Sequence, residues 1–260
     1  MKQTGLFSPI GFIPQNRVAP GAARFLRSHR RGFTLLEIMV SLVVVAILVA
    51  VGIQAASHAV MAAQRSTCQS NLRQLGIALL GHAAEHHGRL PATQHFLPPG
   101  STDSWVFVLA DRLDNLDEVR VSPADPRREE RIEAGGTSYV LNGFLDSMAM
   151  DPFGNPLYPQ WSSIERLPRP AETYMAFIGS ERRGIGAGND HVHGSGWRSW
   201  ARVLADISPD LHRVGPPAED HDEGSANYLM ADGRVINLDA AEVKKEIESG
   251  NNIAIPPNLP

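Results

Sequence analysis

The chain has 260 residues, which is enough for one sizeable folded domain in addition to a membrane anchor. Its single cysteine, Cys68, cannot form an internal disulfide, so an exported domain would depend on its hydrophobic core or on a metal. The charge is unevenly distributed, because residues 1–32 hold six of the 24 Lys and Arg and none of the 28 acidic residues. Residues 33–260 therefore carry a net charge of −10, which argues against nucleic-acid binding because that activity needs a basic surface.

A long apolar segment extends from Phe33 to Ile53, and its only charged residue is Glu37. As a helix these 21 residues would measure about 31 Å, close to the roughly 30 Å thickness of the hydrocarbon layer of a bilayer. Four arginines precede the segment: Arg24, Arg27, Arg30 and Arg31. The positive-inside rule then predicts a single-pass protein whose N-terminus stays in the cytoplasm and whose remaining chain is exported.

A cleavable secretory signal peptide also combines basic residues with an apolar segment. This segment is longer than the apolar core of about 7–15 residues in such peptides, and no small-x-small cleavage site follows a short core. Glu37 is unusual, since a carboxylate inside a membrane-spanning helix costs about 2.5–3.5 kcal/mol. The spacing Thr34-x-x-Glu37 matches a capping box at the start of a helix, and an acid in the first turn also suits the helix dipole.

The sequence Arg-Gly-Phe-Thr-Leu-Leu-Glu at residues 31–37 resembles the processing site of type IV pilins and type II secretion pseudopilins. The resemblance implies that a prepilin peptidase cuts between Gly32 and Phe33 and methylates the new N-terminal Phe33. Pairing of Glu37 with the amine so produced on a neighbouring subunit would offset much of the cost of burying the carboxylate. Residues 1–32 would then be a leader, longer than most leaders of the family, and a translation start inside it would account for that length.

Residues 33–53 are expected to form the membrane-spanning part of a helix that continues in amphipathic form through residues 54–90, because no proline occurs between Pro20 and Pro91. Spacings of three and four predict one face that packs on the rest of the chain: Cys68, Leu72, Leu75, Leu79, Ala83 and His86. The opposite face is expected to be exposed: Ser66, Ser70, Arg73 and Gln74. Gly88, followed by Pro91, predicts the end of this helix.

Several segments also resemble a subgroup of the family with a His-x9-Asp-Gly signature near the C-terminus. The similar pieces are residues 68–79, Ser138-Tyr139-x-x-Asn142 and Ser122-Pro123-Ala124-Asp125, in which serine replaces the cysteine of the subgroup's Cys-Pro-x-Asp.

The signature itself departs from the subgroup, because ten residues instead of nine separate His221 from Asp232-Gly233. Asp232 and Gly233 lie between two β-prone runs and predict a hairpin, since such a turn needs a positive φ. For His221, both a hydrogen bond to a loop and a metal-binding or catalytic role are left open.

The histidines raise alternatives that involve a metal. On a strand, His191-x-His193 would place two imidazoles on one side, and His221 could complete a zinc site. An inverted zincin pattern occurs in the amphipathic region, as His82-Ala83-Ala84-Glu85-His86, although no second zincin element follows. Some pseudopilins bind calcium through carboxylates of the head, and calcium is left unassigned here because no EF-hand spacing occurs.

These patterns together predict an α+β, pilin-like fold, in which the long helix packs on a small antiparallel sheet with long loops in an exported head, residues 91–260. The resemblance implies a structural subunit, not an enzyme, of a type II secretion or type IV pilus-like filament. Its partners would be prepilin peptidase, other pilin-like subunits and the inner membrane, with the head in the periplasm and no cofactor. Two alternatives are kept: a membrane-anchored protein that binds an extracellular ligand without polymerising, and a membrane-anchored metalloenzyme.

Overall fold

The structure is a computed structural model and describes residues 32–94, 97–98, 101–113, 116–146, 150–151, 153, 155, 157–158 and 160–257. Most of the expected leader, residues 1–31, lies outside the described residues. The chain divides into two compact units, residues 1–48 and residues 49–260. Helix α1, Leu35–Glu85, includes the boundary between them, and the other described elements belong to the second unit.

The first part of α1 exposes its apolar side chains. Leu36 is 69% exposed and Leu48 is 66% exposed, and valines and isoleucines between them are exposed as well. A helix that is apolar on all sides needs lipid or other helices around it. Among the described residues, α1 is the one helix that is long and apolar enough to cross a membrane. The chain is therefore suited to a single-pass membrane anchor, as the hydropathy predicted.

The later part of α1 buries one face in the second unit. Its buried residues are Cys68, Asn71, Leu72, Leu75, Gly76, Ala78, Leu79 and Ala83. The predicted face is confirmed except at His86, which is exposed because the helix ends at Glu85 and the chain turns there. His87 and Gly88 both have a positive φ, and the Gly88 amide donates to the Ala83 carbonyl at 2.8 Å, a bond that closes the last turn.

The sheet of the second unit has five strands in the spatial order β3-β1-β2-β4-β5. In chain order the strands are β1 Tyr139–Asn142, β2 Tyr174–Ile178, β3 His191–Val192, β4 Ser225–Met230 and β5 Val235–Asp239. Neighbours are antiparallel, except that β3 is parallel to β1. The α+β class is confirmed, while the sheet is mixed instead of purely antiparallel. Because β2 and β3 run in opposite directions, residues 179–190 connect them by passing the end of β1, at one edge of the sheet.

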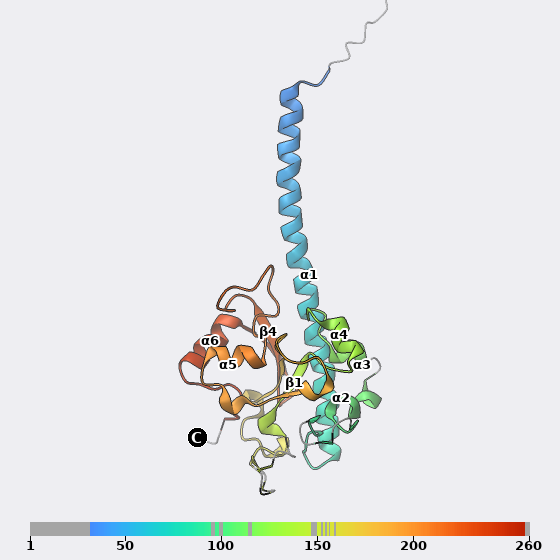
Figure 1. Ribbon diagram of the computed structural model, residues 1–260, viewed down its shortest axis with the longest axis vertical. Coiled ribbons are helices and arrows are strands. Elements are labelled where there is room, and N and C mark those ends of the chain that lie inside the picture. Colours follow the sequence, from blue (N-terminus) through green and yellow to red (C-terminus); the bar gives the residue numbers. More distant parts are fainter. Residues whose placement is uncertain are drawn as a thin grey trace, which may run out of the picture. The chain divides into compact units, whose positions relative to one another are not determined.

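Short helices complete the second unit: α2 Trp105–Val108, α3 Leu116–Arg120, α4 Arg128–Glu133, α5 Trp200–Asp206 and α6 Ala240–Glu248. Figure 1 shows the later part of α1 on one side of the sheet and α5 and α6 on the other. Side chains alternate along a strand, so successive residues of β4 pack on opposite faces of the sheet. Leu229 lies against Gly76 of α1, whereas the ring of Tyr228 meets Phe177, whose ring in turn meets Trp197.

Candidate functional site

The predicted cleavage position lies in exposed, non-helical chain just before α1. Gly32 and Phe33 precede the first helical residue, Leu35, and Phe33 is 82% exposed. A Cβ added at Gly32 would meet no atom within 4 Å, so the fold itself does not require glycine at this position. The structure leaves this peptide bond accessible, and a need for glycine here would have to come from an enzyme that binds the segment.

Thr34 and Glu37 form a capping box at the start of α1. The Thr34 amide donates to Glu37 Oε2 at 2.8 Å, and the Glu37 amide donates to Thr34 Oγ1 at 3.2 Å. The Thr34 hydroxyl also donates to Glu37 Oε2, at 2.9 Å. Both bonds to the carboxylate end on the same oxygen, and Oε1 has no hydrogen-bond partner among the described residues. The cap therefore occupies half of the carboxylate and leaves the other oxygen for a further donor.

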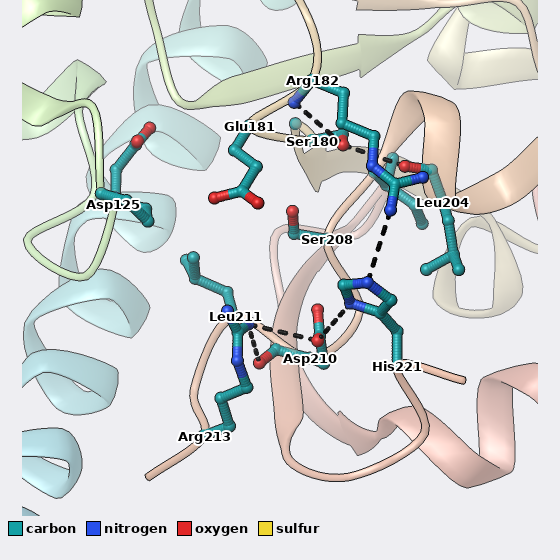
Figure 2. A pocket seen from close by; sticks show the side chains of 13 residues that line it. Asp125, Ser180, Glu181, Arg182, Leu204, Ser208, Asp210, Leu211, Arg213 and His221 are labelled. Carbon is teal, nitrogen blue, oxygen red and sulfur yellow. Dashed lines mark hydrogen bonds and ion pairs between the residues drawn. The ribbon is translucent and has the colours of Figure 1, made fainter. Parts of the chain in front are cut away.

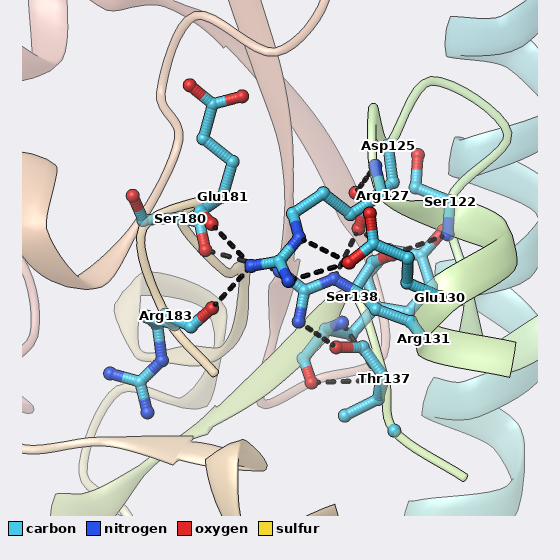
Figure 3. Close-up of polar contacts among 12 residues, drawn as sticks. Ser122, Asp125, Arg127, Glu130, Arg131, Thr137, Ser138, Ser180, Glu181 and Arg183 are labelled. Atoms are coloured by element: carbon cyan, nitrogen blue, oxygen red, sulfur yellow. Dashed lines mark hydrogen bonds and ion pairs between the residues drawn. The ribbon is translucent and has the colours of Figure 1, made fainter. Parts of the chain in front are cut away.

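The two head motifs meet in a buried polar cluster, which we call the Asp125 cluster (Figure 3). The Ser138 hydroxyl donates to Asp125 Oδ2 at 2.5 Å and accepts from the Ser122 amide at 3.0 Å. Arg131 Nε donates to the same Asp125 oxygen at 2.8 Å, and this ion pair is almost fully buried. The two segments that resemble the subgroup thus hold each other through one carboxylate.

Arg131 extends the cluster to distant loops. Its guanidinium donates to the carbonyls of Thr137, Gly184 and Ser180 at 3.1–3.3 Å, so it joins α4 to the connection between β2 and β3. The sequence analysis missed this residue, because the run Arg-Glu-Glu-Arg at residues 128–131 looks like an exposed helix. The cluster holds the loops together by satisfied hydrogen bonds and offers no vacant catalytic group.

The motif on α1 packs against the same region. Cys68 is fully buried, and its burial raises the pKa of its thiol, although the side chains of Tyr139, Asn227 and Ser122 partly offset the effect. Asn227 Nδ2 also donates to the Arg65 carbonyl of α1 at 2.9 Å. The cysteine is therefore a protonated packing residue, without the exposure and low pKa of a reactive thiol.

Asp232 and Gly233 form the predicted hairpin turn between β4 and β5, which is confirmed by the antiparallel pairing of these strands. Gly233 has φ of 88°, a conformation that favours glycine. Asp232 Oδ1 accepts from the Arg234 amide at 3.0 Å, a bond within the turn. Among the described residues, no hydrogen bond joins His221 to this turn, so the residues of the signature do not form one site.

His221 lies instead beside a buried carboxylate (Figure 2). Its Nδ1 is 2.8 Å from Asp210 Oδ2, and its Nε2 is 3.5 Å from a guanidinium nitrogen of Arg182. Ser208 lines the same pocket, but in the part of the chain that the structure describes no hydrogen bond connects its hydroxyl to the imidazole. A relay from serine to histidine to aspartate is therefore not formed, and the hydrogen bond to a loop is the role that the structure gives His221.

Among the described residues, His191 and His193 do not form a metal centre with His221. His191 and His193 approach each other with Nε2 atoms 3.2 Å apart, and His191 Nδ1 is 2.9 Å from Asp190 Oδ1. Within the described ranges, no three His, Cys, Asp or Glu side chains are placed to hold a metal ion. The alternative site of His191, His193 and His221 is therefore not assembled.

The inverted zincin pattern also lacks a site. His82 and His86 stack with ring centroids 3.8 Å apart, and Glu85 is taken up by an ion pair with Arg112. Burial, with the nearby charges of His86 and Arg112, lowers the pKa of His82. The stacked rings and the paired glutamate are a local helix arrangement.

Comparison with known protein families supports the N-terminal assignment. Residues 27–53 match the family described as the prokaryotic N-terminal methylation motif. The matched segment includes Gly32, Phe33 and Glu37, and it covers the apolar part of α1 as far as Ile53. The chain thus carries the pilin- and pseudopilin-type methylation motif at the start of its membrane helix. Comparisons with curated proteins and with solved structures found no match.

Proposed function

We propose that the chain is a structural subunit of a pilus-like filament of the type II secretion or type IV pilus class. In this proposal, prepilin peptidase cuts between Gly32 and Phe33 and methylates the Phe33 amine. The single observation that carries the proposal is the methylation motif at residues 27–53, followed without a break by an exposed apolar helix. The α+β head after that helix is consistent with a pilin-like subunit.

Glu37 supplies the physical reason for assembly. An isolated carboxylate in the hydrocarbon layer costs about 2.5–3.5 kcal/mol, and a neighbouring ammonium group would remove most of that cost. In the proposed filament, the methylated amine of Phe33 on a neighbouring subunit pairs with Glu37 Oε1, the oxygen that the capping box leaves free. The helix would then be the membrane anchor before assembly and the filament core afterwards.

The proposed location follows from the same features. The chain would be held in the inner membrane by one helix, with its head in the periplasm, and it would enter the filament with other pilin-like subunits after processing. The head would belong to the subgroup with the His-x9-Asp-Gly signature. The joining of Ser122, Asp125 and Ser138 in one cluster supports that placement, and the extra residue before Asp232 is this chain's variation.

The test is mass spectrometry of the N-terminal peptide of protein recovered from native membranes. The proposal expects an N-methylated Phe33 as the first residue. A native chain that begins at any other residue, or one that retains Arg30 and Arg31, would contradict it and favour an anchor that does not polymerise. Filament formation is examined separately, by electron microscopy of cells that overproduce the chain together with prepilin peptidase.

A further inference from the structure

A groove of about 430 Å³ lies in the second unit, between α1 and two loops near the start of β4. Its polar lining comes from His58 and Arg65 of α1, from His212 and Arg213, and from Glu223. The volume falls in the range of about 300–1,000 Å³ that is usual for pockets that bind small ligands. Neither the processing of the chain nor its assembly, as proposed above, uses these residues.

His212 is the unusual residue of the groove. It is only 5% exposed, and neither ring nitrogen has a hydrogen-bond partner among the described residues. Its backbone is fixed, because the His212 amide donates to the Ser225 carbonyl at 2.9 Å. Burial, together with the nearby charge of Arg65, lowers the pKa of His212 to about 4. A buried polar side chain nearly always has a partner, so this neutral imidazole points to a group that binds in the groove.

The guanidinium groups around His212 also have unused donors. Arg213 is held through Nη1 by Asp210, at 3.2 Å, yet its Nε is buried without a partner in the described chain. Among the described residues, no hydrogen bond or ion pair engages the Arg65 side chain. Glu223 is the one carboxylate of the lining, and it is exposed. Arg65, Arg213 and His212 therefore line one space whose one carboxylate is exposed, and such a concentration of donor side chains suits a phosphate group.

The position of the groove along α1 suggests where the phosphate comes from. His58 follows Ile53, the last residue of the apolar segment, by about 8 Å of helix, and Arg65 follows it by about 18 Å. The head-group layer adds roughly 5–8 Å on each side of the hydrocarbon. Side chains of a helix point back toward its N-terminus, which directs the long Arg65 side chain toward that layer. The groove would lie at or just above the lipid phosphates.

We propose that this groove binds a phosphate group, supplied by the head group of an anionic phospholipid at the outer face of the membrane. Binding would give an acceptor to the buried imidazole, to the Arg65 guanidinium and to Nε of Arg213. It would also fix the rotation of α1 about its axis at the membrane surface. The inference requires the membrane anchor but not polymerisation, so it stands or falls independently of the filament.

The test uses the full chain in dodecyl maltoside micelles, with ¹⁵N-labelled histidine and the His212 imidazole followed by NMR. Three additions are compared: phosphatidylglycerol in the micelle, diacylglycerol with the same acyl chains but no phosphate, and free inorganic phosphate. The proposal expects phosphatidylglycerol to shift the His212 signals saturably, while diacylglycerol leaves them unchanged. Arg65→Gln should weaken the binding about tenfold, the usual effect of losing one charge-assisted hydrogen bond.

Arg73→Gln is the matched control, because Arg73 is exposed on α1 outside the groove, and this variant should bind like the parent chain. A shift produced by inorganic phosphate but not by phosphatidylglycerol would support a phosphate site and refute the lipid as the source of the phosphate. The proposal is wrong if no phosphate-bearing additive moves the His212 signals, or if Arg65→Gln and Arg73→Gln behave alike. His212→Gln, checked for folding by tryptophan fluorescence, should also weaken binding, and an unchanged affinity would count against the imidazole as a ligand.

Discussion

Replacement of Arg131 by methionine should destabilise the head through one buried ion pair. Arg131 and Asp125 are 2% and 5% exposed at their side chains, and their closest atoms are 2.8 Å apart. Methionine keeps much of the length of the side chain but leaves the Asp125 carboxylate with the Ser138 hydroxyl as its remaining side-chain donor. The carbonyls of Thr137, Gly184 and Ser180 lose a donor at the same time.

The magnitude follows from burial. Removing one partner of a buried ion pair costs about 3–5 kcal/mol, since an uncompensated charge remains in the interior. For a domain of this size, a loss of 1 kcal/mol lowers Tm by about 2–4 °C, so the expected drop is roughly 6–20 °C. Arg169→Met removes the partner of Glu172 in an exposed pair, whose side chains are 43% and 61% exposed. That control should cost at most about 1 kcal/mol.

Tryptophan fluorescence measures the head alone, because all four tryptophans of the chain lie in it: Trp105, Trp161, Trp197 and Trp200. Thermal unfolding of the purified full chain in detergent is therefore followed by this signal. A double variant with Asp125→Leu and Arg131→Met should recover part of the loss, since no lone charge stays buried. If Arg131→Met and Arg169→Met melt within about 2 °C of each other, the Asp125 cluster does not stabilise the head as argued.

Three further predictions concern processing, assembly and pH. Gly32→Leu should leave full-length precursor on an immunoblot although the fold has room for the side chain, and normal maturation would refute the cleavage assignment. Glu37→Val should still be processed but enter filaments poorly, and assembly at the parent level would remove the pairing argument. Because the folded pKa of His212 is about 4, below the ordinary 6.5, the unfolded state binds more protons and stability falls as pH drops from about 6.5 to 4. In phosphate-free buffer this loss should approach about 3 kcal/mol and be absent from His212→Gln, which denaturant titrations at several pH values would measure.

The main features of α1 could be predicted from the sequence because they depend on residues that are close together in the chain. An unbroken apolar run specifies a membrane helix by length and hydropathy, and Thr34 and Glu37 form the capping box that their spacing predicts. The spacing of Cys68, Leu72 and Leu75 marks the buried face of α1 for the same reason, since helical periodicity depends only on neighbours along the chain.

The head depended on contacts between residues far apart in the chain, which no local pattern encodes. The parallel pairing of β3 with β1 and the hydrogen bonds from Arg131 to Ser180 and Gly184 each join segments about 50 residues apart. The contact of His221 with Asp210 joins residues 11 positions apart, at two places in one long loop. His212 has no distinguishing sequence context at all. Its imidazole has no hydrogen-bond partner among the described residues because α1 and the loops near β4 close around it. Tertiary packing alone created both this buried side chain and the groove that it lines.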